Sequence, residues 1–591
     1  MNKNRRKYWL MGIFVIIIMT ALLRGWHLGE FVLFRADQAR DAYLIKDVLD
    51  YGPGYFKLLG PKAGASVVVD DIKGAFKLGP VYNYLQFFGV VLSGGRDPVG
   101  LVLVDFLLSL FAIGLFYYFL RFFFSKKLSL LITVLFVSSY FLTLYARFPW
   151  NINQIVFWEL LLVISLMKII TPTDNRRIIG NWFLVWGLSL AVVGQLHILS
   201  VVGFIFVSLV IFFIYRPSIK LKYFVAVGGI FLLMYSPMIL SDIYNHGDNF
   251  QRFIKAGKME KQIRSPLTKK ITKLGLYHGK NYMLILTGIN KYDYKKISLV
   301  GEIFIGLSVC LIILLFNARK ISQINVLPKK LAEQFKKKLT LNLTQKQFVL
   351  IVLLWFFVFV LIYFRILPRL HKERYWLMVA PLPFIFLAFW FYILGKLNGG
   401  EFKSWGKYIT NGLIVVISGV ILFSNLMAIK TFYGSLKRGE LVTGKFHKKI
   451  TVGPYRFFTG YGEMRNIVDY FANKTNESSA PALCFKSLEY QNRPGFEYLL
   501  DVYYPEIQYK QTGDGGKYNC IFYVITKTSR GERELKDFKN DYNIKERKKF
   551  KSLTVWELKA KNDKIKKQEV KKKQYIQKEG GRVIYWKDVF R

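Results

Sequence analysis

Residues 98–127 of the chain have the sequence PVGLVLVDFLLSLFAIGLFYYFLRFFFSKK. Residues 98–120 are nearly all apolar and long enough to cross the hydrocarbon core of a bilayer as one helix, and basic residues follow at 121–127. The same succession of an apolar run and a short Lys/Arg-rich segment recurs along most of the chain, which is 53% hydrophobic and 17% aromatic. This pattern predicts a polytopic α-helical membrane protein.

The apolar runs predict about eleven transmembrane helices. We place them at residues 8–23, 98–120, 128–145, 153–170, 181–196, 198–215, 221–240, 297–316, 347–367, 373–394 and 408–430. The first run follows basic residues within 2–7, and no small-residue cleavage site comes after it. This arrangement indicates an uncleaved signal anchor rather than a signal peptide.

The formal net charge is +47, and the positions of the basic residues indicate whether it reflects nucleic-acid binding or membrane topology. They concentrate in short segments between the predicted spans, at 121–127, 176–177, 216–222, 319–346 and 396–407. Short basic loops of membrane proteins face the cytoplasm, so this charge does not indicate nucleic-acid binding. With a cytoplasmic N-terminus, the segments left outside are 24–97, 146–152, 241–296, 368–372 and everything after about 431. We expect a multi-pass protein of the cell (cytoplasmic) membrane.

The composition changes after the last predicted span, and the chain divides into three parts: residues 1–432, 433–558 and 559–591. The first is a transmembrane domain whose first outer loop, residues 24–97, carries two expected interfacial helices at 38–49 and 80–92. The second is polar with β-type runs, which predicts a small C-terminal extracytoplasmic α/β domain. The third is a Lys-rich tail that we expect to be solvated or disordered rather than a specific anion-binding arm.

The chain has three cysteines. Cys484 and Cys520 lie in the C-terminal part, where they either form a disulfide, if this part is outside the membrane, or remain buried free thiols. Their spacing matches no metal site. Cys310 lies in a predicted span.

The segment just past the first span has the sequence FRADQARDA at residues 34–42. Asp37 and Asp41 are four residues apart, so a helix places both carboxylates on one face with Arg40 beside them. In a structural interpretation, Asp37 caps the helix N-terminus. In a chemical one, a carboxylate at the membrane surface is a general base for a hydroxyl or amine, and the arginine binds a lipid phosphate. We favour the chemical interpretation, because ionised groups at membrane depth are costly.

Further short motifs follow this one in order along residues 8–250. They are Gly60-Pro61, Leu78–Leu85, Asp97-Pro98, Tyr145–Asn151, Gln195–His197, Ser236-Pro237 and Asp242–His246, with weaker matches at His371 and Tyr375–Pro381. The set resembles bacterial GT-C membrane glycosyltransferases, which include protein O-mannosyltransferases and the aminoarabinose transferase of lipid A. The resemblance implies a GT-C-like fold for residues 1–432. It also implies a sugar donor linked to a polyprenyl phosphate, such as dolichyl or undecaprenyl phosphate.

The resemblance further implies roles for individual residues. Asp37 matches the proposed catalytic base of the family. The glutamate that follows it in the relatives is Gln38 here, so Asp41 is the residue that can supply a second carboxylate. Arg40 matches an arginine that contacts the donor phosphate. Lys77 falls near a Lys-Pro-Pro segment of the aminoarabinose transferases, which makes it a second phosphate contact.

Polar residues at the outer ends of other predicted spans complete the expected site. Arg147 is a further candidate for the donor phosphate, and Asn151, His197 and His246 are candidates for supporting positions. Each also has an ordinary alternative as an interfacial or corner residue. His246 and Asp242 have a spacing that can hold a divalent ion, but no further ligand completes a metal site. We therefore assign no metal site and no certain cofactor, and a divalent ion stays the less favoured alternative.

These inferences predict a hexosyl- or pentosyltransferase that moves a monosaccharide from a polyprenyl-phosphate donor to a lipid, glycan or protein acceptor at the outer face of the membrane. The sequence has no nucleotide-binding loop, which fits a lipid-linked donor. Two other classes remain open. A transporter or flippase of a lipid-linked sugar requires mid-span polar residues, inverted repeats or broken helices. A non-catalytic membrane scaffold requires only a partner for its C-terminal domain.

Overall fold

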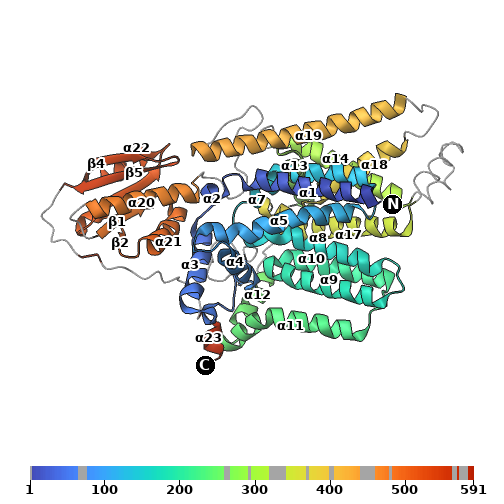
Figure 1. The fold of residues 1–591 in the computed structure, drawn as a ribbon, viewed down its shortest axis with the longest axis horizontal. Helices are drawn as coiled ribbons and strands as arrows, with labels where there is room; N and C mark the ends of the chain where they lie inside the picture. The colour runs from blue at the N-terminus through green and yellow to red at the C-terminus, as the bar shows by residue number, and fades with distance from the viewer. Residues whose placement is uncertain are drawn as a thin grey trace.

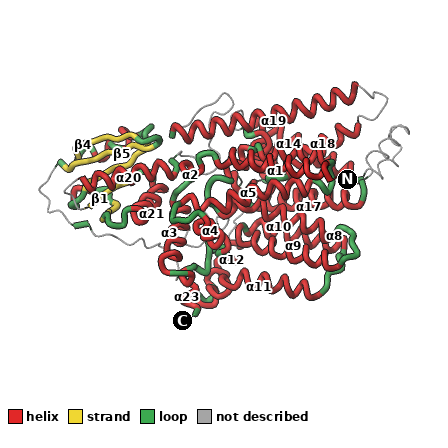
Figure 2. The backbone as a smooth tube through the Cα atoms, in the orientation of Figure 1, coloured by secondary structure: helices red, strands yellow, loops and turns green. Residues whose placement is uncertain are grey.

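The structure is a computed structural model in which long helices lie side by side in one bundle, with a small sheet and its helices beyond one end (Figure 1; Figure 2). The structure describes residues 3–63, 76–258, 266–289, 294–317, 341–367, 370, 372–397, 405–439, 459–477, 482–561, 569–570 and 583–590.

The bundle consists of apolar helices. They are α1 (Lys3–Gly25), α5 (Pro98–Leu120), α6 (Lys126–Val137), α7 (Tyr140–Tyr145), α8 (Ile155–Ile170), α9 (Arg176–Leu196), α10 (Ile198–Tyr215), α11 (Leu221–Tyr244), α13 (Leu267–Thr287), α14 (Tyr294–Phe316), α17 (Leu343–Arg365), α18 (Leu382–Leu397) and α19 (Trp405–Arg438). In the described part of the chain, eight helices are long and apolar enough to cross a membrane, and a bent pair makes up to nine. Every stretch predicted as a span is helical, so the predicted polytopic α-helical architecture is confirmed.

Two predicted spans are interrupted. Ser139 separates α6 from α7; its Oγ accepts the N–H of Leu142 at 3.4 Å and donates to the carbonyl oxygen of Ile285 at 2.7 Å. The 3₁₀ helix η5 (Glu373–Val379) meets α18 at an angle of 48°. Pro381 lies at this junction, and its missing N–H favours a break there.

Residues 241–296, expected as an outer loop, contain α12 (Asp248–Lys258) and α13. α13 packs inside the bundle. Two carbonyl oxygens near its end accept hydrogen bonds from residues elsewhere in the bundle. The carbonyl oxygen of Ile285 accepts from Ser139, and that of Leu286 accepts from Nδ2 of Asn425 at 2.8 Å. Four lysines lower its mean hydropathy, so composition alone does not reveal a buried helix: Lys269, Lys270, Lys273 and Lys280.

The first loop, residues 24–97, carries α3 (Ala36–Tyr51) and α4 (Val81–Leu92), close to the predicted ranges 38–49 and 80–92. The short helices α2 (Leu28–Phe31) and η1 (Pro53–Tyr55) flank α3. α4 packs closely on α5, where a Cβ on Gly89 would lie 2.5 Å from the carbonyl oxygen of Gly100.

The C-terminal domain is a five-stranded mixed sheet with helices, which confirms the predicted small α/β domain. Its strands are β1 (Ala482–Ser487), β2 (Gln508–Gln511), β3 (Ile521–Lys527), β4 (Tyr542–Lys549) and β5 (Leu553–Ala560), in the order β2-β1-β3-β5-β4. β1 pairs in parallel with β2 and β3, whereas β5 is antiparallel to β3 and β4. The main helices, α20 (Tyr461–Glu477) and α21 (Arg493–Tyr503), share an apolar core with the sheet and with α3.

Cys484 in β1 and Cys520 just before β3 form a disulfide, with their Cα atoms 5.6 Å apart. Of the two alternatives for these cysteines, the structure therefore has the disulfide. Cys310 is a free, exposed thiol in α14.

The C-terminal domain docks directly on α3. The hydroxyl of Tyr43 donates to Oδ2 of Asp501 at 2.7 Å, and the hydroxyl of Tyr461 donates to Oδ2 of Asp97 at 2.9 Å. α3 thus lies between the domain and the bundle.

The tail 559–591, expected to be solvated, is partly packed. Residues 583–590, which include α23 (Trp586–Val589), lie beside the first loop, and Ile584 is only 3% exposed. Residues 562–568 and 571–582 lie outside the described residues.

Candidate active site

A cavity of about 270 Å³ lies where the first loop meets the ends of several bundle helices. Polar, charged and aromatic side chains dominate its lining, which consists of Asp37, Arg40, Asp41, Pro61, Lys62, Ala63, Leu78, Tyr82, Trp150, Asn151, Ile152, His197, Ile198, Arg374 and Tyr375. The cavity therefore gathers residues from the first loop, from the start of η3 (Asn151–Gln154), from the α9–α10 junction, and from η5.

The first two turns of α3 present two carboxylates to this cavity. Arg35 is the N-cap, with an extended backbone (φ −133°, ψ −168°), so Asp37 is not the cap and lies within the first helical turn. The positive end of the helix dipole favours a carboxylate there. Asp41 follows one turn later on the same face, as the spacing predicts.

Arg40 joins the two carboxylates. Its Nε and Nη2 lie 2.8 and 2.7 Å from Oδ1 of Asp41, and its Nη1 lies 3.2 Å from Oδ1 of Asp37. Two nitrogens of the guanidinium thus hold one carboxylate oxygen while the third reaches the other residue.

The two carboxylates differ in environment. The side chain of Asp37 is 62% exposed, whereas that of Asp41 is 7% exposed. Burial raises the pKa of Asp41 above its ordinary value, and the charge of Arg40 opposes this rise. Asp37 is the carboxylate that an incoming molecule can reach, and Asp41 is the one that fixes the arginine.

Gln38, which replaces the glutamate of the relatives, does not line the cavity. It is buried, and its Nε2 donates to the carbonyl oxygen of Pro149 at 3.0 Å. An ionised glutamate has no N–H for this bond. Gln38 therefore ties α3 to the segment that supplies Trp150 and Asn151.

Motifs that are far apart in the sequence pack together beside the cavity. The N–H of Gly60 donates to the carbonyl oxygen of Leu78 at 2.8 Å, and a Cβ on Gly60 would overlap the carbonyl of Gly79. A Cβ on Gly79 would in turn overlap Oε1 of Gln195, which accepts the N–H of Val81 at 3.2 Å. These contacts require glycine at both positions.

Two of the expected supporting residues lie at the cavity. Nδ2 of Asn151 donates to the carbonyl oxygen of Leu196 at 2.7 Å, which joins the start of η3 to the end of α9. His197 is buried, and its ring centroid lies 5.6 Å from that of Tyr375 in an edge-to-face arrangement.

Arg147 does not line the cavity. It is fully buried and donates to the carbonyl oxygens of Arg24 and of Trp26, the latter at 2.7 Å. Its Nη1 also lies 3.2 Å from the hydroxyl of Tyr433. These partners give Arg147 a structural role at the end of α1, in place of the expected phosphate contact.

Lys77 and His246 also lie outside the cavity lining. The main chain of Lys77 pairs with Asn249, whose Oδ1 accepts its N–H at 2.6 Å and whose Nδ2 donates to its carbonyl oxygen at 3.1 Å. His246 is exposed in a turn with φ 52°. Within the described residues, no group of three or more His, Cys, Asp or Glu side chains is placed to hold a metal ion.

Two cations and an aromatic pair were missed from the sequence. Lys62 and Arg374 line the cavity, and the guanidinium carbon of Arg374 lies 4.7 Å from the ring centroid of Trp150 and 5.3 Å from that of Tyr375. One signal was available: both cations lie in or next to segments predicted to be outside, where basic residues are less common.

Tyr82 lines the cavity, and hydrogen bonds from its hydroxyl fix its side chain. Its hydroxyl donates to Oδ2 of Asp105 at 3.3 Å and accepts from Nε2 of Gln86 at 3.0 Å. Asp105 is 1% exposed within α5. This buried network orients the Tyr82 ring.

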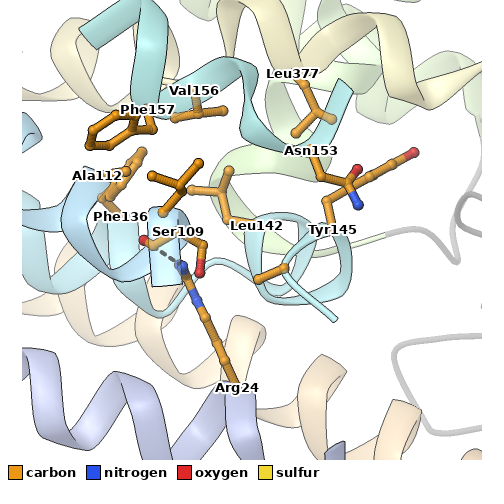
Figure 3. A pocket seen from close by; sticks show the side chains of 12 residues that line it. Arg24, Ser109, Ala112, Phe136, Leu142, Tyr145, Asn153, Val156, Phe157 and Leu377 are labelled. Atoms are coloured by element: carbon orange, nitrogen blue, oxygen red, sulfur yellow. Dashed lines mark hydrogen bonds between the residues drawn. The ribbon is translucent and has the colours of Figure 1, made fainter. Parts of the chain in front are cut away.

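A second cavity, of about 20 Å³, lies among α1, α5, α7 and α8 (Figure 3). Apolar side chains such as Phe136, Val156 and Leu377 line most of it, and Arg24 enters it with Nη1 donating to the carbonyl oxygen of Ser109 at 3.1 Å. Such a volume admits about one water molecule. The larger cavity is therefore the candidate active site.

The fold and this cavity define a class: a multi-pass helical membrane protein with a carboxylate- and arginine-lined cavity beside a C-terminal α/β domain. No protein family and no curated protein matches the sequence.

Solved structures do show a likeness. The chain is similar to ArnT from Cupriavidus metallidurans in the apo state, with 10% identity, a TM-score of 0.43, and coverage of 93% of this chain and 98% of that chain. It is also similar to the oligosaccharyltransferase AglB from Archaeoglobus fulgidus in complex with an inhibitory peptide and a dolichol-phosphate. That comparison has 9% identity, a TM-score of 0.44, and coverage of 90% of this chain and 70% of that chain. Both are GT-C enzymes, the class that the sequence motifs resemble.

Proposed function

We propose that the protein is a glycosyltransferase that moves one monosaccharide from a polyprenyl-phosphate donor to an acceptor at the outer face of the cytoplasmic membrane. The observation that carries this proposal is the cavity at the end of an apolar bundle. It combines an accessible carboxylate, Asp37, with three cations, Arg40, Lys62 and Arg374. A base and a set of phosphate-binding cations are the two groups that such a transfer needs.

The outer face is supported by two independent features. The basic segments between spans agree with one orientation, in which the C-terminal domain is outside. The Cys484–Cys520 disulfide lies in that domain, and disulfides persist in oxidising compartments.

The donor phosphate would bind mainly to Lys62 and Arg374. Arg40 is already held by the carboxylates of Asp37 and Asp41, so little of its charge is left for a phosphate. Arg374 comes from η5, and the rings of Trp150 and Tyr375 lie against its guanidinium, which can bind phosphate through two parallel hydrogen bonds.

In the proposed reaction, the carboxylate of Asp37 takes the proton of the acceptor O–H or N–H as the acceptor atom attacks the anomeric carbon. The bond from this carbon to the phosphate oxygen breaks, and polyprenyl phosphate leaves with the electron pair. Lys62 and Arg374 stabilise the charge that develops on the leaving oxygen. Attack opposite to the leaving group inverts the anomeric configuration.

The cavity size favours a single sugar. About 270 Å³ is just below the range of ~300–1,000 Å³ that is typical of small-molecule sites. A hexosyl or pentosyl group fits such a volume better than an oligosaccharide does, and the aromatic rings of Trp150, Tyr82 and Tyr375 offer apolar faces for it.

A transfer assay tests the proposal. Detergent-solubilised full-length protein is incubated with a radiolabelled polyprenyl-phosphate monosaccharide and an envelope extract as acceptor source. We expect label in the acceptor fraction together with an equal amount of released polyprenyl phosphate. Movement of the intact labelled donor across a proteoliposome bilayer without this release would contradict the proposal and identify a flippase.

A further inference from the structure

The C-terminal segment, residues 583–590, returns to the first loop at a distance from the sheet that precedes it in the chain (Figure 1). It pairs with residues 56–58 through main-chain hydrogen bonds. The N–H of Leu58 donates to the carbonyl oxygen of Ile584, and the N–H of Trp586 donates to the carbonyl oxygen of Phe56, both at 3.1 Å. The two segments form an isolated antiparallel β-bridge, with Lys57 opposite Tyr585.

Side chains reinforce this pairing. Nε1 of Trp586 donates to the hydroxyl of Tyr84 on α4 at 2.9 Å. The ammonium group of Lys587 lies 3.6 Å from the ring centroid of Tyr55. A Cβ on Gly54 would lie 3.2 Å from Cβ of Lys587, so η1 and α23 touch. Trp586 thus connects two parts of the first loop that are separated in sequence.

The paired segment leads directly into the cavity wall. Residues 56–58 are followed, after Leu59 and Gly60, by Pro61, Lys62 and Ala63, which line the cavity. α4, which Trp586 contacts through Tyr84, carries the lining residue Tyr82. Lys57 is 9% exposed, and its charge acts on Asp41.

We propose that residues 583–590 form an intramolecular clamp that holds the 56–63 segment in place, and that Trp586 is a positioning residue for Lys62. The kinetic part of this proposal rests on the proposed function, because Lys62 is there a contact of the donor phosphate. The structural part does not depend on it. A chain end that pairs with a loop through main-chain hydrogen bonds lowers the entropy of that loop and pre-organises its side chains.

The structural test uses full-length protein with residues 583–591 deleted. Because main-chain hydrogen bonds to residues 56–58 are lost, we expect amide hydrogen exchange in residues 53–63 to rise about tenfold or more, while exchange in α20 stays unchanged. A synthetic peptide with the sequence of residues 580–591, added in trans, restores the protection. Unchanged exchange in residues 53–63, or failure of the peptide to restore it, would overturn the clamp.

The kinetic test uses single substitutions. Trp586→Ala is expected to raise the KM for the donor about three- to tenfold with a smaller change in kcat, since Lys62 is misplaced before chemistry begins. Trp586→Phe keeps an aromatic ring but lacks the Nε1 donor to Tyr84, so we expect a KM between those of the wild type and Trp586→Ala. Leu92→Ala is the control, because Leu92 is on α4 like Tyr84, is 71% exposed and does not line the cavity. A fall in kcat alone, or equal effects of the Trp586 and Leu92 truncations, would contradict the positioning role. If the wild type transfers no sugar, the proposed function fails while the exchange experiment still decides the clamp.

Discussion

Nη2 of Arg40 lies 2.7 Å from Oδ1 of Asp41, and the same guanidinium reaches Asp37 through Nη1. The first two turns of α3 therefore contain an arginine that contacts two carboxylates before any ligand arrives. Arg40 orders the two carboxylates, and Lys62 and Arg374 are the contacts that we propose for the donor phosphate.

Replacing Arg374 tests whether this residue binds the donor phosphate. Arg374→Ala is expected to raise the Kd for a polyprenyl phosphate by about tenfold or more, because a hydrogen bond to a charged group contributes ~1.5–3 kcal/mol. Binding to detergent-solubilised protein is measured by calorimetric titration. Arg96→Ala is the control, because Arg96 is a cation of the first loop that pairs with Asp50 and does not line the cavity. Equal Kd values in the two variants would remove Arg374 from the site.

Replacing Arg147 should affect stability rather than binding. Arg147→Met leaves the buried carbonyl oxygens of Arg24 and Trp26 without their donor, which costs ~1–3 kcal/mol for each unsatisfied group. We expect a clearly lower Tm, and an unchanged Kd for polyprenyl phosphate in the protein that remains folded. A weaker Kd at unchanged Tm would restore Arg147 as a phosphate contact.

Glu497 makes the stability of the C-terminal domain depend on pH. Burial raises its pKa from 4.5 to about 7, Asp501 adds to the rise, and Arg493 opposes it. Between pH 4.5 and about 7, the Glu497 carboxyl keeps a proton in the folded domain that it has lost in the unfolded chain. Stability that is complete below pH 4.5 is therefore lost as the pH rises through about 7.

We expect the Tm of full-length protein to fall between pH 5 and pH 8, and the Glu497→Gln variant to lose most of this dependence. Glu506→Gln serves as the control, because Glu506 is exposed nearby. Parallel Tm–pH curves for the wild type and Glu497→Gln would show that this carboxyl does not govern the dependence.

Removal of the C-terminal domain should impair the site. A chain that ends at residue 458 loses the partners of Tyr43 and Asp97, so one face of α3 becomes exposed. We expect weaker binding of polyprenyl phosphate and faster amide exchange in α3 than in the full-length protein. Full-length protein with the disulfide removed by Cys484→Ala and Cys520→Ala keeps these contacts and is the comparison. Wild-type affinity in the truncated chain would mean that the bundle alone holds α3.

The membrane architecture could be predicted because hydropathy reports directly on the helices that lie in a bilayer. Every predicted span is helical, and the C-terminal part forms a sheet, as its β-type runs predict. α13 could not be predicted, since its lysines mask a helix whose burial depends on tertiary contacts with Ser139 and Asn425. The docking of residues 583–590 is likewise a tertiary effect within a Lys-rich segment.

The candidate site could be predicted in part. The spacing of Asp37, Arg40 and Asp41 within one helix determines their common face, so local sequence was sufficient for them. The direction of a side chain outside such a helix is not encoded locally. Arg147 lies in a motif next to the cavity yet points to carbonyl groups at the end of α1, and Arg374 reaches the cavity from far along the chain.

Sugar transfer by Asp37→Asn, compared with Asp50→Asn, shows whether Asp37 is the catalytic base. Asp50 is also on α3 but pairs with Lys46 and Arg96 and does not line the cavity. The assay measures release of polyprenyl phosphate from its monosaccharide-loaded form. We expect Asp37→Asn to lower the rate by about 10²–10⁴-fold, as the loss of a general base does, and Asp50→Asn to leave it near the wild-type value. Normal turnover in Asp37→Asn would show that Asp37 is not the general base of the transfer.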